Sequence, residues 1–103
     1  MMRPRGHVYL IGNTQLNYYK IGIAWDIVRR MADFSLPFEI ELLAYITLPT
    51  ATKARDIEQG LHAHFSANHL RGEWFRDITK DQFISAAEDL STKSLSKVSW
   101  RHS

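Results

Sequence analysis

The sequence predicts a small α+β domain in which a mainly antiparallel, three-stranded sheet is flanked by helices. Three runs rich in β-branched or alternating apolar residues predict strands, and segments with apolar residues at helical spacing predict helices. Their order, β-β-α-β-α-(β)-α, implies a sheet covered by helices. With 103 residues and no internal repeat or linker, we expect one domain over residues 1–90 and a polar C-terminal tail over residues 91–103.

The first two strands form a predicted hairpin. Residues 7–11 and 18–23 are rich in β-branched and aromatic side chains, and they flank the polar segment 12–17. This pattern is typical of a hairpin with a longer loop.

The hairpin brings a tyrosine near a lysine. If the turn is centred between Thr14 and Gln15, Tyr9 lies opposite Lys20, and both side chains project from the same face with Cβ atoms about 5 Å apart. An ammonium so close would favour the tyrosinate or at least orient the phenol oxygen, which could then act as a general base. The alternative is an ordinary strand pair, and a slip of one residue would separate the two side chains.

A short helix follows the hairpin. Asp26 suits the N-cap position, and the helix is expected to run to about Phe34, with Pro37 ending the segment. Ile27, Met31 and Phe34 would form the buried edge, which Arg30 borders.

Residues 38–48 predict the third strand, because apolar and polar residues alternate there. One face would carry Phe38, Ile40, Leu42, Ala44 and Ile46.

The most regular helix is predicted over residues 51–65, and its apolar edge contains a glutamate. The apolar residues at helical spacing are Ala54, Ile57, Leu61 and Phe65. Glu58 shares their inward edge, where a carboxylate loses several kcal/mol of hydration unless a cation or hydrogen-bond donors meet it. A metal ion or a role as an essential base would explain its position, and so would a buried structural ion pair with Arg30.

The remaining segments add a short extended piece and a last helix. We expect a loop at residues 69–72, an extended piece at residues 73–75, and a helix from Lys80 to about Leu90. Its inward residues would be Phe83, Ala86, Ala87 and Leu90.

Composition excludes several classes of protein. No cysteine is present, which rules out disulfides and thiolate zinc sites, and His64 and His69 offer no convincing ligand spacing for zinc. No apolar run approaches the roughly 20 residues of a membrane span, and the basic N-terminus is a poor signal peptide. We therefore expect a soluble intracellular (cytoplasmic) protein that does not act at a membrane.

Charge is unevenly distributed along the chain. Residues 1–30 contain five basic residues and one acid, whereas residues 31–75 contain six acids and three bases. A basic surface around the N-terminal elements would suit nucleic acid, although a solvated face without a partner explains the asymmetry equally well.

Five short motifs, in order and at compatible spacing, resemble the GIY-YIG endonuclease superfamily. The branch that matches best is typified by a bacteriophage T5 open reading frame and is often described as a DNA-binding domain. The motifs are Val8-Tyr9, the Tyr-Lys-Ile-Gly run at residues 19–22, Arg29-Arg30, the Glu-x-x-x-His helix segment at residues 58–62, and Glu-Trp-Phe at residues 73–75. The resemblance covers residues 6 to about 77.

The resemblance implies hydrolysis of DNA phosphodiester bonds with one divalent metal ion, Mg²⁺ or Mn²⁺. Tyr9 matches the superfamily's tyrosine, which assists or deprotonates the attacking water. Arg30 matches the arginine that binds the phosphate, and Glu58 matches the carboxylate that binds the metal ion. The second-motif role falls to Lys20 if the glycines are aligned, or to Tyr19, displaced by one residue.

The sequence also departs from the superfamily pattern. His7 replaces the first motif's glycine, Phe34 stands where some relatives have a helical histidine, and no residue clearly matches their late asparagine. These departures put catalytic turnover in question more than DNA binding.

Further residues are candidates for the site or for DNA contact. His62 lies four residues after Glu58, where it could orient the carboxylate, touch the phosphate, or simply pack. Arg29 and Trp25, together with Lys20 and Arg30, are candidates for DNA binding. We therefore consider a metal-dependent DNA endonuclease that uses a targeting partner, a catalytically inactive DNA-binding module, and a protein-interaction domain in which Glu58 pairs with Arg30.

Overall fold

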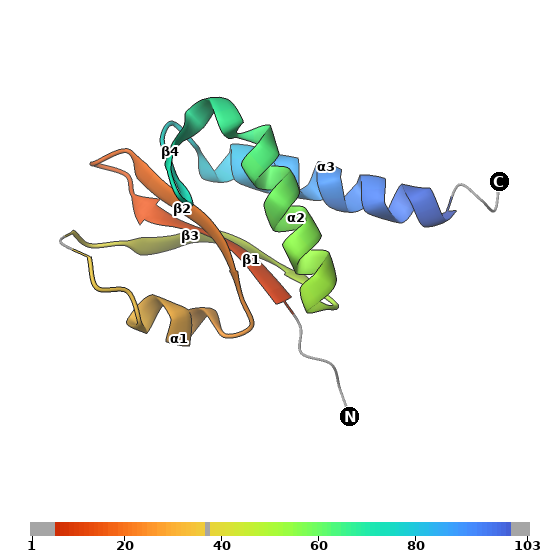
Figure 1. The fold of residues 1–103 in the computed structure, drawn as a ribbon, viewed down its shortest axis with the longest axis horizontal. Coiled ribbons are helices and arrows are strands. Elements are labelled where there is room, and N and C mark those ends of the chain that lie inside the picture. Colours follow the sequence, from red (N-terminus) through yellow and green to blue (C-terminus); the bar gives the residue numbers. More distant parts are fainter. Residues whose placement is uncertain (1–5, 37, 100–103) are drawn as a thin grey trace.

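The computed structural model describes residues 6–36 and 38–99, with the side chains of residues 93–99 outside the description. Arg3 and Arg5 of the expected basic surface, Pro37, and residues 100–103 also lie outside the described residues. The elements, labelled in Figure 1 where there is room, are β1 (Gly6–Asn13), β2 (Tyr18–Ala24), α1 (Ile27–Ala32), β3 (Glu41–Leu48), α2 (Ala51–His64), the 3₁₀ turn η1 (Ser66–Asn68), β4 (His69–Arg71), β5 (Trp74–Phe75) and α3 (Lys80–Ser99). The expected α+β class is confirmed.

The sheet has five strands in the order β3-β1-β2-β5-β4, and each pair is antiparallel. The prediction of three strands was therefore wrong in number. β4 and β5 contain only three and two residues, too few to show an alternating pattern, and β4 occupies the segment predicted as a loop.

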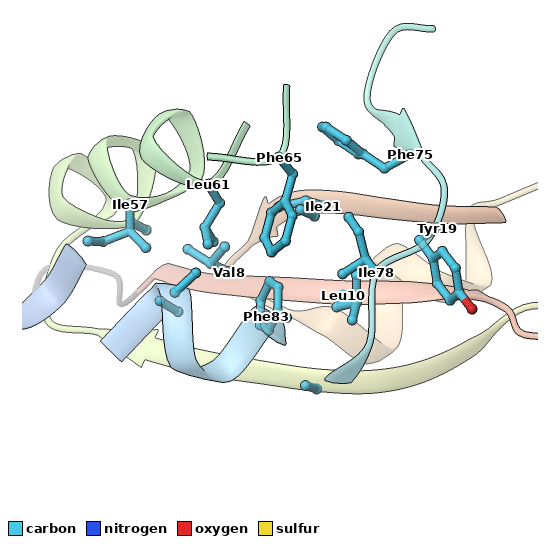
Figure 2. Packing of buried hydrophobic residues seen from close by; sticks show 14 of the residues in the cluster. Val8, Leu10, Tyr19, Ile21, Ile57, Leu61, Phe65, Phe75, Ile78 and Phe83 are labelled. Carbon is cyan, nitrogen blue, oxygen red and sulfur yellow. The ribbon is translucent and has the colours of Figure 1, made fainter. Parts of the chain in front are cut away.

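Helices cover both faces of the sheet. α2 and α3 lie over one face and α1 over the other (Figure 1). The main core lies between the sheet, α2 and α3 (Figure 2), and its largest fully buried side chains are Phe75, Phe83, Leu10, Ile21, Leu61, Ile78 and Val8. Ile11 is also fully buried but belongs to a second, smaller cluster on the α1 side of the sheet. Each such side chain stabilises the fold by roughly 1.5–3 kcal/mol through burial. The predicted inward edges of α2 and α3 are confirmed.

α1 and α2 each begin after a residue whose side chain caps the helix, and the cap at Asp26 was predicted. The Asp26 side chain accepts a hydrogen bond from the Arg29 N–H at 3.1 Å, and the Thr50 side chain accepts one from the Lys53 N–H at 3.1 Å. Their ends differ more from expectation: α1 ends at Ala32 instead of about Phe34, and α3 continues past the predicted end at Leu90 to Ser99.

A β-bulge interrupts the alternation predicted for the third strand. Leu10 pairs with Ala44, but the next residue of β1, Ile11, pairs with Leu42, so Leu43 is the extra residue. A bulge shifts the pairing by one residue, so Leu42 does not share the face of Ala44 and Ile46 as predicted. Leu43 packs against the main core in its place. The strand also begins at Glu41, later than the predicted start at residue 38.

The hairpin register differs from the predicted one by two residues. Tyr9 pairs with Gly22, and Lys20 pairs with Ile11. The assumption of a turn centred between Thr14 and Gln15 was wrong, because the turn spans residues 14–17. A shift of two residues preserves the face from which a side chain projects, so Tyr9 and Lys20 still project from the same face.

A pair of reciprocal hydrogen bonds ties the hairpin loop to the segment before α3. The Asn17 amide donates to the Asp77 carboxylate at 2.7 Å, and the Asp77 backbone N–H donates to the Asn17 side-chain oxygen at 2.9 Å. Both residues adopt left-handed backbone conformations, with φ of 55° and 58°. Asn and Asp tolerate this region better than most residues, so both can make this contact, which fixes the hairpin loop to the segment that follows β5.

Candidate active site

The candidate site lies at the edge of β2, where the short strand β5 ends. β5 pairs with β2 only at Tyr19 and Lys20. At the next residue, Ile21, the backbone N–H donates to the Glu73 carbonyl at 3.4 Å, and the backbone carbonyl oxygen lies 2.9 Å from His62 Nε2 of α2. A side chain of α2 therefore completes the hydrogen bonding of β2 beyond the end of the sheet ladder.

The contact with Ile21 determines which nitrogen of His62 carries the proton. A carbonyl oxygen can only accept, so Nε2 must donate, and in the neutral ring Nδ1 is then an acceptor. The ring is further held by an edge-on contact with Phe75, with ring centroids 5.0 Å apart. His62 thus has a structural partner on one side of its ring and an available lone pair on the other.

A cleft of about 340 Å³ opens beside this edge, and residues far apart in the chain line it. The lining residues are Tyr9, Lys20, Ile23, Arg30, Phe34, Glu58, His62 and Glu73. They come from β1, β2, α1 and its C-terminal end, α2, and the turn between β4 and β5. Five of the residues singled out from the sequence therefore meet at one cleft: Tyr9, Lys20, Arg30, Glu58 and His62.

Tyr19 does not line this cleft. Its side chain lies in the main core, beside Ile78 and Leu10, and only 7% of the residue is exposed (Figure 2). Because successive side chains of a strand point to opposite faces, Lys20 faces the cleft and Tyr19 cannot. We therefore leave Tyr19 out of the candidate site.

The phenol of Tyr9 lies over Gly22, its partner across the hairpin. A Cβ atom added at Gly22 would lie 2.5 Å from the Tyr9 hydroxyl oxygen, so glycine provides the space for this ring. Only 2% of Tyr9 is exposed, and burial raises its pKa to about 12, against a smaller opposing effect of Arg30. The expectation that a neighbouring cation favours the tyrosinate was therefore wrong for the protein without ligands, because desolvation outweighs the cationic groups.

Lys20 is held by an ion pair and by aromatic rings. Its Nζ lies 3.1 Å from Glu73 Oε2, and 13% of the lysine side chain is exposed. The same nitrogen lies 5.7 Å from the centroid of the Phe34 ring and 5.8 Å from that of Trp74. Such cation–π contacts and the carboxylate together fix the ammonium at the cleft.

Glu73 is the site residue that the sequence analysis missed. It was noted there only as part of the Glu-Trp-Phe motif, with no role at the site. Its side chain faces the cleft because the turn between β4 and β5 returns to the edge of β2.

Glu58 reaches the cleft without an ion pair to Arg30. The ion pair at this cleft joins Lys20 to Glu73, and among the side chains that the structure describes none joins Glu58 to Arg30. Burial raises the pKa of Glu58, and the nearby Glu73 raises it further, whereas His62, Lys20 and Arg55 oppose the shift. The structural pair of Glu58 with Arg30, on which the protein-interaction alternative rested, is therefore not formed.

Three side chains of the cleft could hold a divalent cation. One ligand atom from each of Glu58, His62 and Glu73 lies within 4.8 Å of the others, a spread that one ion can span. Carboxylate oxygens suit Mg²⁺ and Mn²⁺, and the imidazole adds a nitrogen donor. The incompletely compensated burial of Glu58 also favours a cation beside it. These residues fit a metal ion of the predicted kind.

The other candidates for DNA contact lie next to the cleft. A separate hollow is lined by Ala24, Trp25, Asp26, Arg29, Arg30 and Asp33, so Arg30 borders both spaces. Trp25 is 72% exposed, and Arg29 is also exposed. Arg29 and Trp25 thus extend the surface that begins at the cleft, on the side of α1.

Comparison with known protein families identifies the family of this chain. A family model described as the T5orf172 domain matches residues 6–91, from the start of β1 into α3. Comparison with the curated proteins and with the solved structures gives no match. None of the helices in the described part of the chain has the length and apolar character needed to span a membrane.

Proposed function

Because this chain belongs to the T5orf172 family, a nuclease-related group, we propose that it is a metal-dependent endonuclease that hydrolyses DNA phosphodiester bonds. The observation that supports this proposal most directly is the convergence of a phenol, an ammonium, a guanidinium, an imidazole and two carboxylates on one cleft. These groups can bind a phosphate, hold a cation and move a proton, which are the tasks of phosphodiester hydrolysis.

Each side chain has a role that its surroundings support. Arg30 is the exposed cation at the mouth of the cleft, and a guanidinium can grip two phosphate oxygens at once. Glu58 would hold Mg²⁺ or Mn²⁺, with Glu73 and His62 as further donors. When bound, the ion would supply positive charge that stabilises the charge developing on the phosphate oxygens.

Tyr9 and Lys20 act on the water. The Tyr9 oxygen, in its ionised form, would accept a proton from the attacking water, and Lys20 would stabilise that ionised form. Since the pKa of Tyr9 is about 12 without ligands, added positive charge in the cleft must lower it before the phenol serves as a base. We therefore expect Tyr9 to accept a proton from water only when a cation is bound in the cleft.

A plasmid-nicking assay tests the proposal. Supercoiled DNA is incubated with the protein and Mg²⁺ or Mn²⁺, and with the variants Tyr9→Phe and Glu58→Ala. Matched controls are Tyr45→Phe and Glu41→Ala, which make the same changes at exposed positions of β3 outside the cleft. Nicking that requires metal, is lost in both site variants and persists in both controls supports the nuclease. Equal loss in site and control variants contradicts it.

A DNA-binding module without turnover is the second candidate, and one observation favours it. In the protein without ligands, Lys20 is paired with Glu73 and the phenol of Tyr9 is protonated, so neither is free to activate water. Salt-sensitive DNA binding without nicking under any of these conditions would support this second function.

A further inference from the structure

Next to the cleft is a second space, also of about 340 Å³. Four small residues line it, Gly6, Ala24, Ala51 and Ala54, and Ile23, Trp25 and Arg30 complete the lining. Gly6 and Ala54 are in close contact, because a Cβ added at Gly6 would overlap the Ala54 Cβ. We call this space the Trp25 hollow.

The Trp25 hollow adjoins the candidate active site. Ile23 and Arg30 line both spaces, so a molecule bound to Arg30 lies at the border of the two. Arg30 and Trp25 also border the hollow that contains Arg29. A phosphate held by Arg30 would thus have an apolar space on one side and a second guanidinium nearby.

The composition of the Trp25 hollow suits a flat, apolar ligand attached to a phosphate. The indole of Trp25, 72% of which is exposed, provides a ring on which another ring can stack. Bases of single-stranded nucleic acid stack on such side chains, and neighbouring cations bind the backbone. Arg30 lines the Trp25 hollow, and Arg29 lines the adjoining hollow together with Asp26 and Asp33. The guanidinium of Arg30 favours a ligand that carries a phosphate over an apolar peptide as the occupant.

We propose that the Trp25 hollow holds one unstacked nucleobase of the DNA strand whose phosphate lies at Arg30. This inference rests on the proposed function, because it takes the cleft as the place of the scissile phosphate. Removing a base from a duplex costs a few kcal/mol, and less when the base is mismatched or already single-stranded. The protein is therefore expected to prefer single-stranded or mismatched DNA to a perfect duplex.

Binding without metal tests the hollow separately from hydrolysis. Affinity for a fluorescein-labelled single-stranded oligonucleotide is measured by anisotropy for the wild type, Trp25→Ala and Ala51→Leu. The first variant removes the stacking ring and the second fills the space. Each should weaken binding about tenfold, a size expected for one base–aromatic stack. Trp25→Tyr should retain most of the affinity.

The control variant is Val28→Ala, which removes an exposed apolar side chain of α1 outside the hollow. It should bind like the wild type. In a second series, one abasic nucleotide is moved along the oligonucleotide. At one position the abasic site should weaken wild-type binding and leave the affinity of Trp25→Ala unchanged, because the lost base and the lost ring belong to one contact.

The outcomes separate the two proposals. If the wild type binds and nicks DNA while Trp25→Ala and Ala51→Leu bind as well as the wild type, the base site is wrong and the nuclease stands. Equal weakening by Val28→Ala, or no Trp25-dependent abasic position, also overturns the base site. If the wild type binds the oligonucleotide with the expected dependence on Trp25 but never nicks DNA, the base site stands and the nuclease fails. A wild type that binds no DNA contradicts both.

Discussion

The hydroxyl group of Tyr9 lies directly over the α-carbon of Gly22, so that a single methyl group at Gly22 would meet the Tyr9 oxygen at 2.5 Å. The two residues are direct partners across the β1–β2 hairpin. The glycine of the Tyr-Lys-Ile-Gly motif thereby sets the position of the phenol in the cleft.

The variant Gly22→Ala should displace the phenol and impair DNA nicking while leaving the fold intact. Misplacing a reacting group by about 1 Å can lower a rate about 100-fold, and overpacking costs roughly 1–3 kcal/mol of stability. Nicking rates and urea unfolding measure the two effects. Gly60→Ala is the matched control, since the three atoms nearest to its added methyl group belong to the Leu90 side chain of α3. Full activity of Gly22→Ala would show that the position of the phenol is unimportant.

The raised pKa of Tyr9 predicts how stability changes in alkaline solution. With a pKa of about 12 in the folded protein and 10.0 ordinarily, the folded state holds this proton more tightly than the unfolded state. The contribution to stability is therefore complete below pH 10 and is lost as pH rises toward 12. Tyr9→Phe should lack this component, which comparison of its urea unfolding with that of the wild type at successive pH values would reveal. Identical pH dependence of the two proteins would contradict the assignment.

Glu58 should lower the stability of the metal-free protein at neutral pH. Its pKa is raised above the ordinary 4.5, chiefly by burial, so the folded state favours the protonated acid. Stability from this group is present below about pH 4.5 and declines as pH rises through the folded pKa. Glu58→Gln should accordingly be at least as stable as the wild type at pH 7, and the difference should disappear in acid.

Glu73→Gln should lower the stability of the protein, in contrast to Glu58→Gln, because it removes the carboxylate that forms an ion pair with Lys20. Glu73 is 48% exposed at its side chain, so the loss should be limited to about 1 kcal/mol. Thermal or urea unfolding of both variants at pH 7 tests the pair. A strongly destabilised Glu58→Gln would mean that the carboxylate has a structural partner.

In its neutral form, the His62 ring should carry its proton on Nε2. The 2.9 Å contact with the Ile21 carbonyl requires a donor at that atom, which leaves Nδ1 as the ring nitrogen that can accept a hydrogen bond or bind a cation. Two-dimensional ¹⁵N–¹H spectra of the neutral ring should show this tautomer, and Mn²⁺ should broaden the Nδ1 signal. His62→Leu should lose about 1–3 kcal/mol because the buried carbonyl loses its donor. Observation of the Nδ1-protonated tautomer would exclude Nδ1 as a metal ligand.

The sequence by itself determined those features that depend on neighbouring residues. The caps at Asp26 and Thr50 and the inward edge of α2 follow from local hydrogen bonds and from the helical period. The period of two in a strand placed Tyr9 and Lys20 on one face even though the predicted register was wrong.

Only the tertiary structure decided what depends on contacts between distant segments. The hairpin register follows the geometry of the turn. The bulge at Leu43 reverses the alternation of β3, and the residue pattern of β3 alone does not predict this bulge. Whether Lys20 would pair with Glu73, and whether Glu58 would remain apart from Arg30, depends on how the β4–β5 turn and α2 approach the edge of β2. Local periodicity fixes the direction of a side chain, whereas its partner is fixed by the packing of the whole domain.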